Sequence, residues 1–257
     1  MAPEKIITFT CPYLTAPISL TGKKCSRLCE YCRGQYLEHM YDLNKLDKIS
    51  FSKYKSVLVS GGYDEQGKIP IFENIPFLKT VKNANLKVIL HPGNIDLSRV
   101  GELVGLVDVL SLEMGERPPG EDAEYFQALN RIIPTVPHLL LGRWGADLFE
   151  ELDYIEALGD IENPPARIVF LVLIPKDNMP PPVLGRLKEF FKQAEIFLPE
   201  TEFYLGCMRP SGTYREKLDR MCIEMGFSRI VNPARSITQD YLKRGIPFRE
   251  TWECCIL

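Results

Sequence analysis

The sequence has little of what marks membrane, secreted or nucleic-acid-binding proteins. No apolar run approaches the roughly 20 residues that span a bilayer. The first residues, MAPEKIITFTCPY, lack the long apolar segment of a signal peptide. Lysine and arginine total 31 against 34 aspartates and glutamates, so the net charge of −3 implies no general attraction to nucleic acid. We therefore expect a cytoplasmic protein without nucleic-acid or membrane partners.

Histidine is also scarce, which bears on metal binding. The three histidines, His39, His91 and His138, are far apart in the sequence, and His91 at an expected strand end is more often a satisfied histidine than a ligand. A zinc site usually needs histidines or two CxxC-like pairs, although these histidines could still converge in the fold. Eight cysteines in a chain expected to be intracellular favour metal or redox chemistry over a disulfide framework.

Short apolar strands alternate with helical segments along most of the 257 residues. Because the strands are apolar on both faces, they are typical of a parallel sheet, and their number favours an α/β fold, a (β/α) TIM-type barrel that is full or nearly full. The expected strands are 5–11, 18–21, 56–60, 87–91, 107–113, 138–142, 167–175, 202–206 and 228–231, and the expected helices 35–46, 75–83, 98–104, 121–132, 147–158, 181–194, 213–225 and 236–243. We expect a single domain over 1–257, with a short N-terminal extension (1–16) and a cysteine-containing tail (245–257).

Three cysteines stand close together directly after the expected strand 18–21. Cys25, Cys29 and Cys32 are spaced x3 and x2, and the aromatic Tyr31 precedes the third. Three thiolates from one loop can hold three irons of a [4Fe–4S] cube and leave the fourth iron without a protein ligand. An open iron can bind a substrate or cofactor, by the logic that separates catalytic from structural zinc sites.

This loop, with Tyr31 in its place, resembles the signature loop of the radical S-adenosylmethionine (SAM) enzymes. The resemblance implies a barrel of the radical SAM type in which Cys25, Cys29 and Cys32 hold a [4Fe–4S] cluster. It further implies that the open iron binds SAM and that an electron from the cluster cleaves SAM to a 5′-deoxyadenosyl radical.

Other strand ends carry residues suited to the same cofactor, because chemistry in such barrels lies at the carboxyl ends of the strands. The glycines after strand 56–60 occupy the place of the family's Gly-Gly-Glu motif, although Tyr63 and Asp64 stand where its acidic residue begins; a plain strand-ending turn is the alternative. A carboxylate could accept hydrogen bonds from the SAM ribose, and a guanidinium could pair with the SAM carboxylate; solvated rim charges are the alternative. The expected SAM-binding residues are Ser60, Gly61, Gly62, Glu113 and Arg143.

The remaining cysteines raise the question of a second iron–sulfur cluster. Cys11, Cys207 and the adjacent pair Cys254 and Cys255 could converge on the barrel mouth as its ligands. Scattered, unrelated thiols are the alternative. Cys222, inside an expected helix, is better explained as a small core residue.

The whole chain most resembles the biotin synthase and lipoyl synthase branch of the radical SAM enzymes. The segments PISLTGKKCSRLCEYCRGQYLEHM and LGCMRPSGTYREKLD resemble archaeal-type two-component lipoyl synthases. This resemblance implies a sulfurtransferase that inserts sulfur from the second cluster into an unactivated C–H bond of an octanoyl-lysine. The implied partners are SAM, an octanoylated or lipoylated carrier domain, a second radical SAM subunit and an electron-donor protein.

Two other functions remain open from the sequence. One is a radical SAM enzyme of another reaction type (a lyase, a methylase or an enzyme of cofactor biosynthesis) with a single cluster. The other is a non-catalytic, metal-stabilised binding protein. The sequence identifies neither a catalytic residue nor a substrate.

Overall fold

The computed structural model describes residues 6–27, 29, 31–48, 50–145, 148–175 and 180–257. The chain forms two compact units. The first unit comprises Met1–Pro12, Met114–Gln127 and Pro137–Thr251, and the second comprises Tyr13–Glu113, Ala128–Val136 and Trp252–Leu257. Residues 1–5 of the expected N-terminal extension, Leu28 and Glu30 of the cysteine loop, and the start of the expected helix 147–158 lie outside the described residues.

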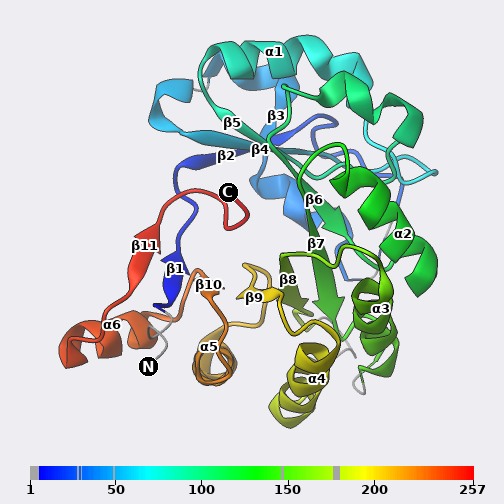
Figure 1. The fold of residues 1–257 in the computed structure, drawn as a ribbon. Coiled ribbons are helices and arrows are strands. Elements are labelled where there is room, and N and C mark those ends of the chain that lie inside the picture. The colour runs from blue at the N-terminus through cyan, green and yellow to red at the C-terminus, as the bar shows by residue number, and fades with distance from the viewer. Residues whose placement is uncertain (1–5, 28, 30, 49, 146–147, 176–179) are drawn as a thin grey trace. The chain divides into compact units, whose positions relative to one another are not determined.

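The second unit is built on parallel strands in the order β6-β5-β4-β2-β3. These strands are β2 (Thr15–Ser19), β3 (Tyr41–Asp42), β4 (Ser56–Ser60), β5 (Lys87–Leu90) and β6 (Val109–Glu113). Helix α1 (Ile75–Asn83) joins β4 to β5, and short 3₁₀ helices cover Gln35–His39, Leu43–Lys48, Phe51–Lys53, Phe72–Asn74 and Leu97–Leu103 (Figure 1).

The first unit holds parallel strands in the order β11-β1-β10-β9-β8-β7. The strands are β1 (Thr8–Thr10), β7 (Thr135–Leu141), β8 (Arg167–Val172), β9 (Glu202–Leu205), β10 (Arg229–Val231) and β11 (Arg249–Thr251). The helices are α2 (Pro119–Asn130), α3 (Phe149–Asp160), α4 (Leu184–Phe197), α5 (Gly212–Glu224) and α6 (Arg235–Arg244). The division between the units falls within α2 and β7, whose Thr135 and Val136 belong to the second unit.

The alternation of parallel strands with helices confirms the predicted fold class, an α/β fold of the TIM-barrel type. Val57 and Val59 of β4 and Val88 and Ile89 of β5 are fully buried, as expected for strands covered on both faces. β-Branched side chains suit such strands because they pack well on a pleated surface. The sequence pattern therefore located β4, β5, β6, β9 and β10 to within two residues at both ends.

Several elements differ from the sequence prediction; the expected helix 98–104, for example, is a 3₁₀ helix over Leu97–Leu103. The expected helix 35–46 is two 3₁₀ helices separated by β3, which pairs with Ile18 and Ser19 of β2. β2 begins before the expected strand 18–21 and includes Pro17. The proline is tolerated because β3 does not extend beside it and no ladder hydrogen bond is needed on that side. β11 was not predicted, because two charged residues and a threonine carry no strand pattern until β1 pairs with them.

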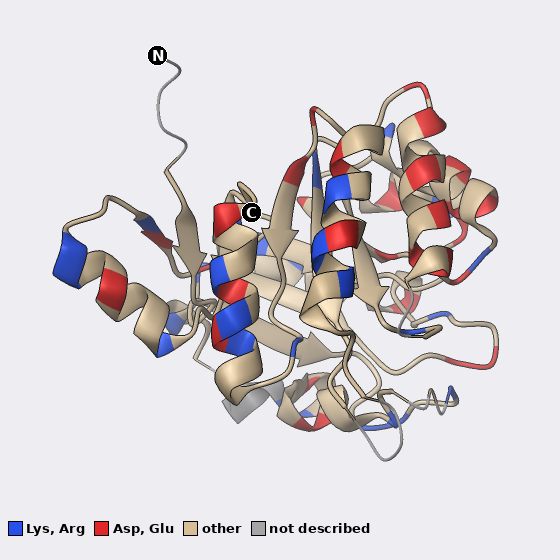
Figure 2. Ribbon diagram, turned by 90° about the horizontal axis from the view of Figure 1, so that it is seen from below, with Lys and Arg blue, Asp and Glu red and all other residues tan. Residues whose placement is uncertain are grey.

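Charges of both signs follow one another along the helices (Figure 2). On α5 and α6, Arg220 pairs with Glu216 at 3.2 Å and Arg244 pairs with Asp240 at 3.3 Å. Each such exposed pair contributes only about 0.3–0.5 kcal/mol to stability. The surface pairs therefore add little to the stability that the apolar core supplies.

Candidate functional site

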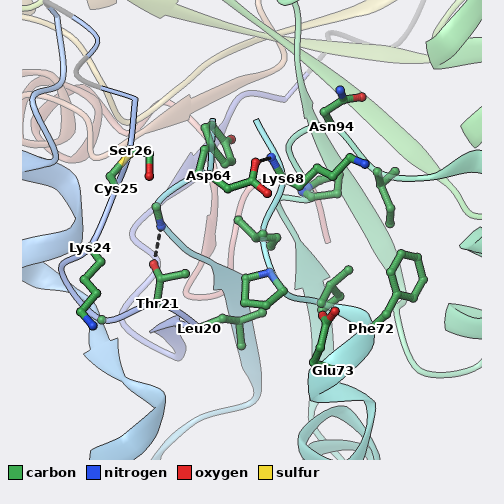
Figure 3. Close-up of a pocket in the computed structure, with 18 of the residues that line it drawn as sticks. Leu20, Thr21, Lys24, Cys25, Ser26, Asp64, Lys68, Phe72, Glu73 and Asn94 are labelled. Atoms are coloured by element: carbon green, nitrogen blue, oxygen red, sulfur yellow. Dashed lines mark hydrogen bonds between the residues drawn. The ribbon is translucent and has the colours of Figure 1, made fainter. Parts of the chain in front are cut away.

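A pocket of about 920 Å³ lies at the carboxyl ends of β2, β4 and β5 in the second unit. We call it the carboxyl-end pocket. Thr21, Lys24 and Cys25 come from the loop after β2, and Asp64 and Lys68 from the loop after β4 (Figure 3). Asn94 follows β5 and completes this side of the wall. The position agrees with the rule that the loops after barrel strands carry the chemistry.

The loop after β4 is held by a carboxylate and tied to the loop after β5. Asp64 accepts hydrogen bonds from the backbone N–H groups of Gln66 and Lys68, both at 2.9 Å. The N–H of Asn94 donates to the carbonyl of Gly67 at 2.8 Å. Gly67 has a φ of +76°, a conformation that a glycine adopts without strain. The two loops therefore form one connected wall of the pocket.

Gly62, one of the two glycines predicted to bind SAM, holds the wall of the pocket that the loop after β2 forms. The N–H of Gly62 donates to the hydroxyl of Thr21 at 2.7 Å, and a Cβ at Gly62 would collide with the carbonyl of Lys24 and with Cys25. Ser60 is buried, and its carbonyl accepts a hydrogen bond from the N–H of Leu20 at 2.8 Å. The glycine is thus needed for close contact between two loops, and its predicted role in binding SAM stays untested.

The pocket carries charge of both signs over an apolar floor. Its cations are Lys23, Lys24, Lys68 and Arg99, its anions are Asp42, Asp64, Glu73 and Asp96, and its buried apolar side chains include Leu20, Ile69, Ile71 and Ile95. Arg99 binds Glu102 through two hydrogen bonds, at 2.7 and 3.0 Å, and lies over the ring of Phe72. Hydrogen bonds from the hydroxyl and N–H of Ser98 hold the pKa of Asp96 below its usual value. Such a lining suits a small molecule with polar groups and an apolar part.

Three titratable side chains meet beside this pocket; we call them the acid–base cluster. The hydroxyl of Tyr31 donates to Oε1 of Glu113 at 2.9 Å. Nε2 of His91 lies 3.8 Å from Oε2 of the same carboxylate. Glu113 ends β6, His91 follows β5 and Tyr31 comes from the cysteine loop. The ring of Tyr63, which lines the pocket, packs edge-on against His91 with centroids 6.4 Å apart.

The sequence did not reveal this cluster. The sequence predicts Glu113 as a partner of SAM, gives Tyr31 only as part of the cysteine motif, and favours a satisfied strand-end histidine at His91. The available signal was that β5 and β6 are neighbours in a parallel sheet, so residues at their carboxyl ends share one edge. The position of Tyr31 depends on the path of the loop, which no periodicity specifies.

The cysteine loop does not form the predicted metal site. Cys25 lines the carboxyl-end pocket, and its thiol donates to the carbonyl of Arg27 at 3.1 Å. Cys29 and Cys32 are partly exposed. Within the described part of the chain, no three histidine, cysteine, aspartate or glutamate side chains are placed to hold a metal ion.

The radical SAM interpretation is therefore wrong. This correction covers the identification with the biotin synthase and lipoyl synthase branch, the sulfur-inserting reaction and the single-cluster radical SAM alternative. The physical reason is that cysteine spacing places thiols on one loop, whereas ligation needs their sulfur atoms to converge on one point. The arrangement of Cys25, Cys29 and Cys32 does not fit a [4Fe–4S] cluster.

The other predicted site residues lie in both units. Cys11 and Cys207 belong to the first unit, and Cys254 and Cys255 to the second. Burial raises the pKa of Cys11, with a smaller contribution from Glu250. The predictions of a second cluster, of SAM as a cofactor, and of carrier, second-subunit and electron-donor partners stay predictions.

Arg143, predicted to bind the SAM carboxylate, lies in the first unit. Its guanidinium donates to Glu116 at 3.2 Å and lies beside the ring of Trp144. The N–H groups of Gly142 and Arg143 both donate to Oε1 of Glu151, at 2.7 and 3.1 Å. Burial raises the pKa of Glu151, although these backbone hydrogen bonds oppose the shift. Glu151 of α3 thus fixes the two residues that directly follow β7, and the role of Arg143 stays a prediction.

The thiols are expected to differ sharply in reactivity. Cys207 is exposed, whereas Cys222 is buried and its pKa is raised well above the usual value, first by burial and then by Asp219. Because the thiolate is the reactive form, we expect a thiol reagent to modify Cys207 quickly and Cys222 only after unfolding. Mass spectrometry of the native protein after a short iodoacetamide pulse measures both. Early modification of Cys222 would contradict the burial.

Comparisons with known proteins add little. No family model matches the sequence, and no curated protein matches it. Among solved structures, the chain is similar to a thermostable mutant of a xylanase, Xyn10A from Cellvibrio japonicus, with 8% identity, coverage of 86% of each chain and a TM-score of 0.46. This similarity is too weak to bear on function or on the site.

The structure bears on two general predictions, that the protein is an enzyme and that it lacks membrane-spanning segments. The fold is one whose carboxyl strand ends carry active sites, which supports the prediction of an enzyme in this general form; the radical SAM sulfurtransferase was the wrong refinement of it. None of the described helices is both long enough and apolar enough to cross a bilayer.

Proposed function

We propose that the protein is an enzyme that transfers protons on a small polar substrate held in the carboxyl-end pocket. The acid–base cluster carries this proposal, because a carboxylate lies within 2.9 Å of a phenol and 3.8 Å of an imidazole at the strand ends. Glu113 is the proton-transferring group. Tyr31 orients its carboxylate, and His91 stabilises its charged form when the imidazole is protonated.

The arrangement supports both directions of proton transfer. A carboxylate can accept a proton from a substrate, and the resulting acid can return it to another atom. The side chain of Glu113 is 17% exposed and that of His91 is 29% exposed, so both are partly shielded while remaining reachable. Tyr63 belongs to the pocket wall and contacts His91, which connects the substrate space to the cluster.

The test is turnover of pooled small metabolites followed by NMR, with wild type beside Glu113→Gln. Glutamine keeps the shape and can still accept the hydrogen bond from Tyr31, but it cannot take up a proton. We expect the rate on any consumed compound to fall by about 10²–10⁴-fold, the usual contribution of a general acid or base. His91→Gln is expected to lower the rate less.

His39→Gln is the matched control, since His39 is exposed and lies outside the cluster. Its rate should equal that of wild type. Undiminished turnover in Glu113→Gln would contradict the proposal. So would a consumed compound whose binding shifts no NMR signal from the second unit.

A further inference from the structure

A second pocket lies at the other end of the strands. It has a volume of about 620 Å³ and is formed within the second unit at the amino ends of β4 and β5. We call it the amino-end pocket. Its lining includes Phe51, Tyr54, Lys55, Leu86, Lys87 and Glu253. Active sites of barrels lie at the carboxyl strand ends, so this pocket is separate from the proposed active site.

Backbone hydrogen bonds build the pocket from segments distant in sequence. The N–H of Lys55 donates to the carbonyl of Leu14 at 2.9 Å, and the N–H of Lys87 donates to the carbonyl of Lys55 at 3.1 Å. The C-terminal tail is fixed on both sides of Glu253. The N–H of Leu14 donates to the carbonyl of Trp252 at 2.7 Å, and the N–H of Cys254 donates to the hydroxyl of Thr15 at 2.8 Å.

Glu253, which lines this pocket, has a buried carboxylate oxygen without a hydrogen-bond donor among the described residues. Its Oε1 is shielded from solvent and accepts no hydrogen bond from any residue that the structure describes. The ammonium of Lys87 lies 3.6 Å away, within ion-pair range but beyond a hydrogen bond. A buried acceptor without a donor is costly, and most buried acceptors in native proteins have one. A donor on a bound molecule would satisfy this oxygen.

The rest of the lining defines the other parts of such a molecule. Phe51, Tyr54 and Leu86 supply apolar and aromatic surface. The hydroxyl of Tyr54 is hydrogen-bonded to that of Tyr41 at 2.9 Å, which fixes the ring. Lys55 and Lys87 are exposed and bring two positive charges against the single negative charge of Glu253. The excess positive charge favours a ligand that carries a carboxylate as well as an ammonium.

We infer that the amino-end pocket binds a small zwitterion, an α-amino acid with an apolar side chain. The ammonium donates to Glu253, the carboxylate faces Lys55 and Lys87, and the apolar side chain packs on Phe51 and Tyr54. Because the pocket is separate from the proposed active site, its ligand is an effector of this protein and not its substrate. The role of the ligand as an effector rests on the proposed function, whereas its binding to the amino-end pocket does not.

The test uses Trp252, which directly precedes Glu253, as a fluorescent reporter. The chain has two tryptophans, so Trp144→Phe leaves Trp252 as the single one. L-phenylalanine and L-leucine are titrated into this variant, beside N-acetyl-L-phenylalanine, which lacks the ammonium, and phenethylamine, which lacks the carboxylate. We expect saturable fluorescence changes with both amino acids and at least tenfold weaker binding of the two analogues. Calorimetry on the wild-type protein checks the dissociation constants.

Glu253→Gln, made in the Trp144→Phe variant, should weaken the binding of both amino acids by about tenfold or more, as expected for loss of a charge-assisted hydrogen bond. Glu195→Gln, a change at an exposed glutamate of α4, is the control and should bind as the parent does. If Glu253→Gln fails to fold, Lys55→Ala provides the second variant. It should remove the preference for phenylalanine over phenethylamine.

Two results would overturn the inference. One is the absence of a saturable signal with both amino acids in fluorescence and in calorimetry. The other is equal affinity of the parent for phenylalanine and for its N-acetyl derivative.

Discussion

Asp219→Ala is expected to lower the free energy of unfolding by about 3–5 kcal/mol, the usual effect of breaking a buried ion pair by removing one partner. Asp219 and Arg209 have fully buried side chains, and Nε of Arg209 lies 2.9 Å from Oδ1 of Asp219. The substitution would leave the guanidinium without its counter-charge inside the first unit. It would also deprive the N–H of Ala234 of its acceptor, which lies 2.7 Å away.

The remaining hydrogen bonds of Arg209 explain why it cannot turn away. Its guanidinium donates to the carbonyls of Gly206, Val231 and Asn232, at 2.6, 2.7 and 3.2 Å. These carbonyls lie at or directly after the carboxyl ends of β9 and β10, so the arginine joins two strand ends to α5. An arginine shortly after a strand is usually a solvated rim residue, whereas the side chain of Arg209 is part of the core.

Urea denaturation of wild type and Asp219→Ala measures the loss. Asp240→Ala is the control, because Asp240 makes only exposed pairs and its loss should change stability by less than about 1 kcal/mol. The double variant Arg209→Met with Asp219→Leu should be more stable than Asp219→Ala, since apolar replacement of both partners is often neutral. A single variant as stable as wild type would show that the pair is not buried in solution.

Gly62→Ala is the second change with a large expected effect. The added methyl group would collide with the backbone carbonyl of Lys24 and lie 2.6 Å from Cβ of Cys25. The nearest atom is a backbone carbonyl oxygen, which cannot rotate away as the end of a flexible side chain can. The loop after β2 must therefore move. We expect a loss of about 1–3 kcal/mol in stability, as for overpacking of a well-packed core.

The same change should also reshape the carboxyl-end pocket, because Lys24 and Cys25 form its wall. Gly101→Ala is the matched control: a Cβ at Gly101 meets no atom within 4 Å, and its φ is not in the left-handed region. Thermal unfolding measures stability, and the solvent accessibility of Cys25 to a small thiol reagent measures the loop. Unchanged stability together with unchanged Cys25 reactivity would contradict the close contact.

The strand pattern was predictable because its physical basis is local. Buried parallel strands need apolar residues on both faces, as in Ser56–Ser60 and Arg167–Val172. A short run of consecutive residues is therefore enough to show the pattern. The cysteine spacing, by contrast, suggested ligands, but spacing alone does not set the direction in which side chains point. Cys25 turns its thiol to a carbonyl of its own loop instead.

The sequence by itself determined the α/β fold class, the order of the strands along the chain and the end of the strands at which the candidate site lies. Only the tertiary structure decided which loop residues meet. It joined Tyr31 and His91 to Glu113, buried Arg209 against Asp219, and placed Glu253 of the tail beside Lys87. Periodicity indicates whether a side chain faces the core. These contacts depend instead on loop paths and on hydrogen bonds between distant segments, such as the bond from the N–H of Cys254 to the hydroxyl of Thr15, 239 residues away.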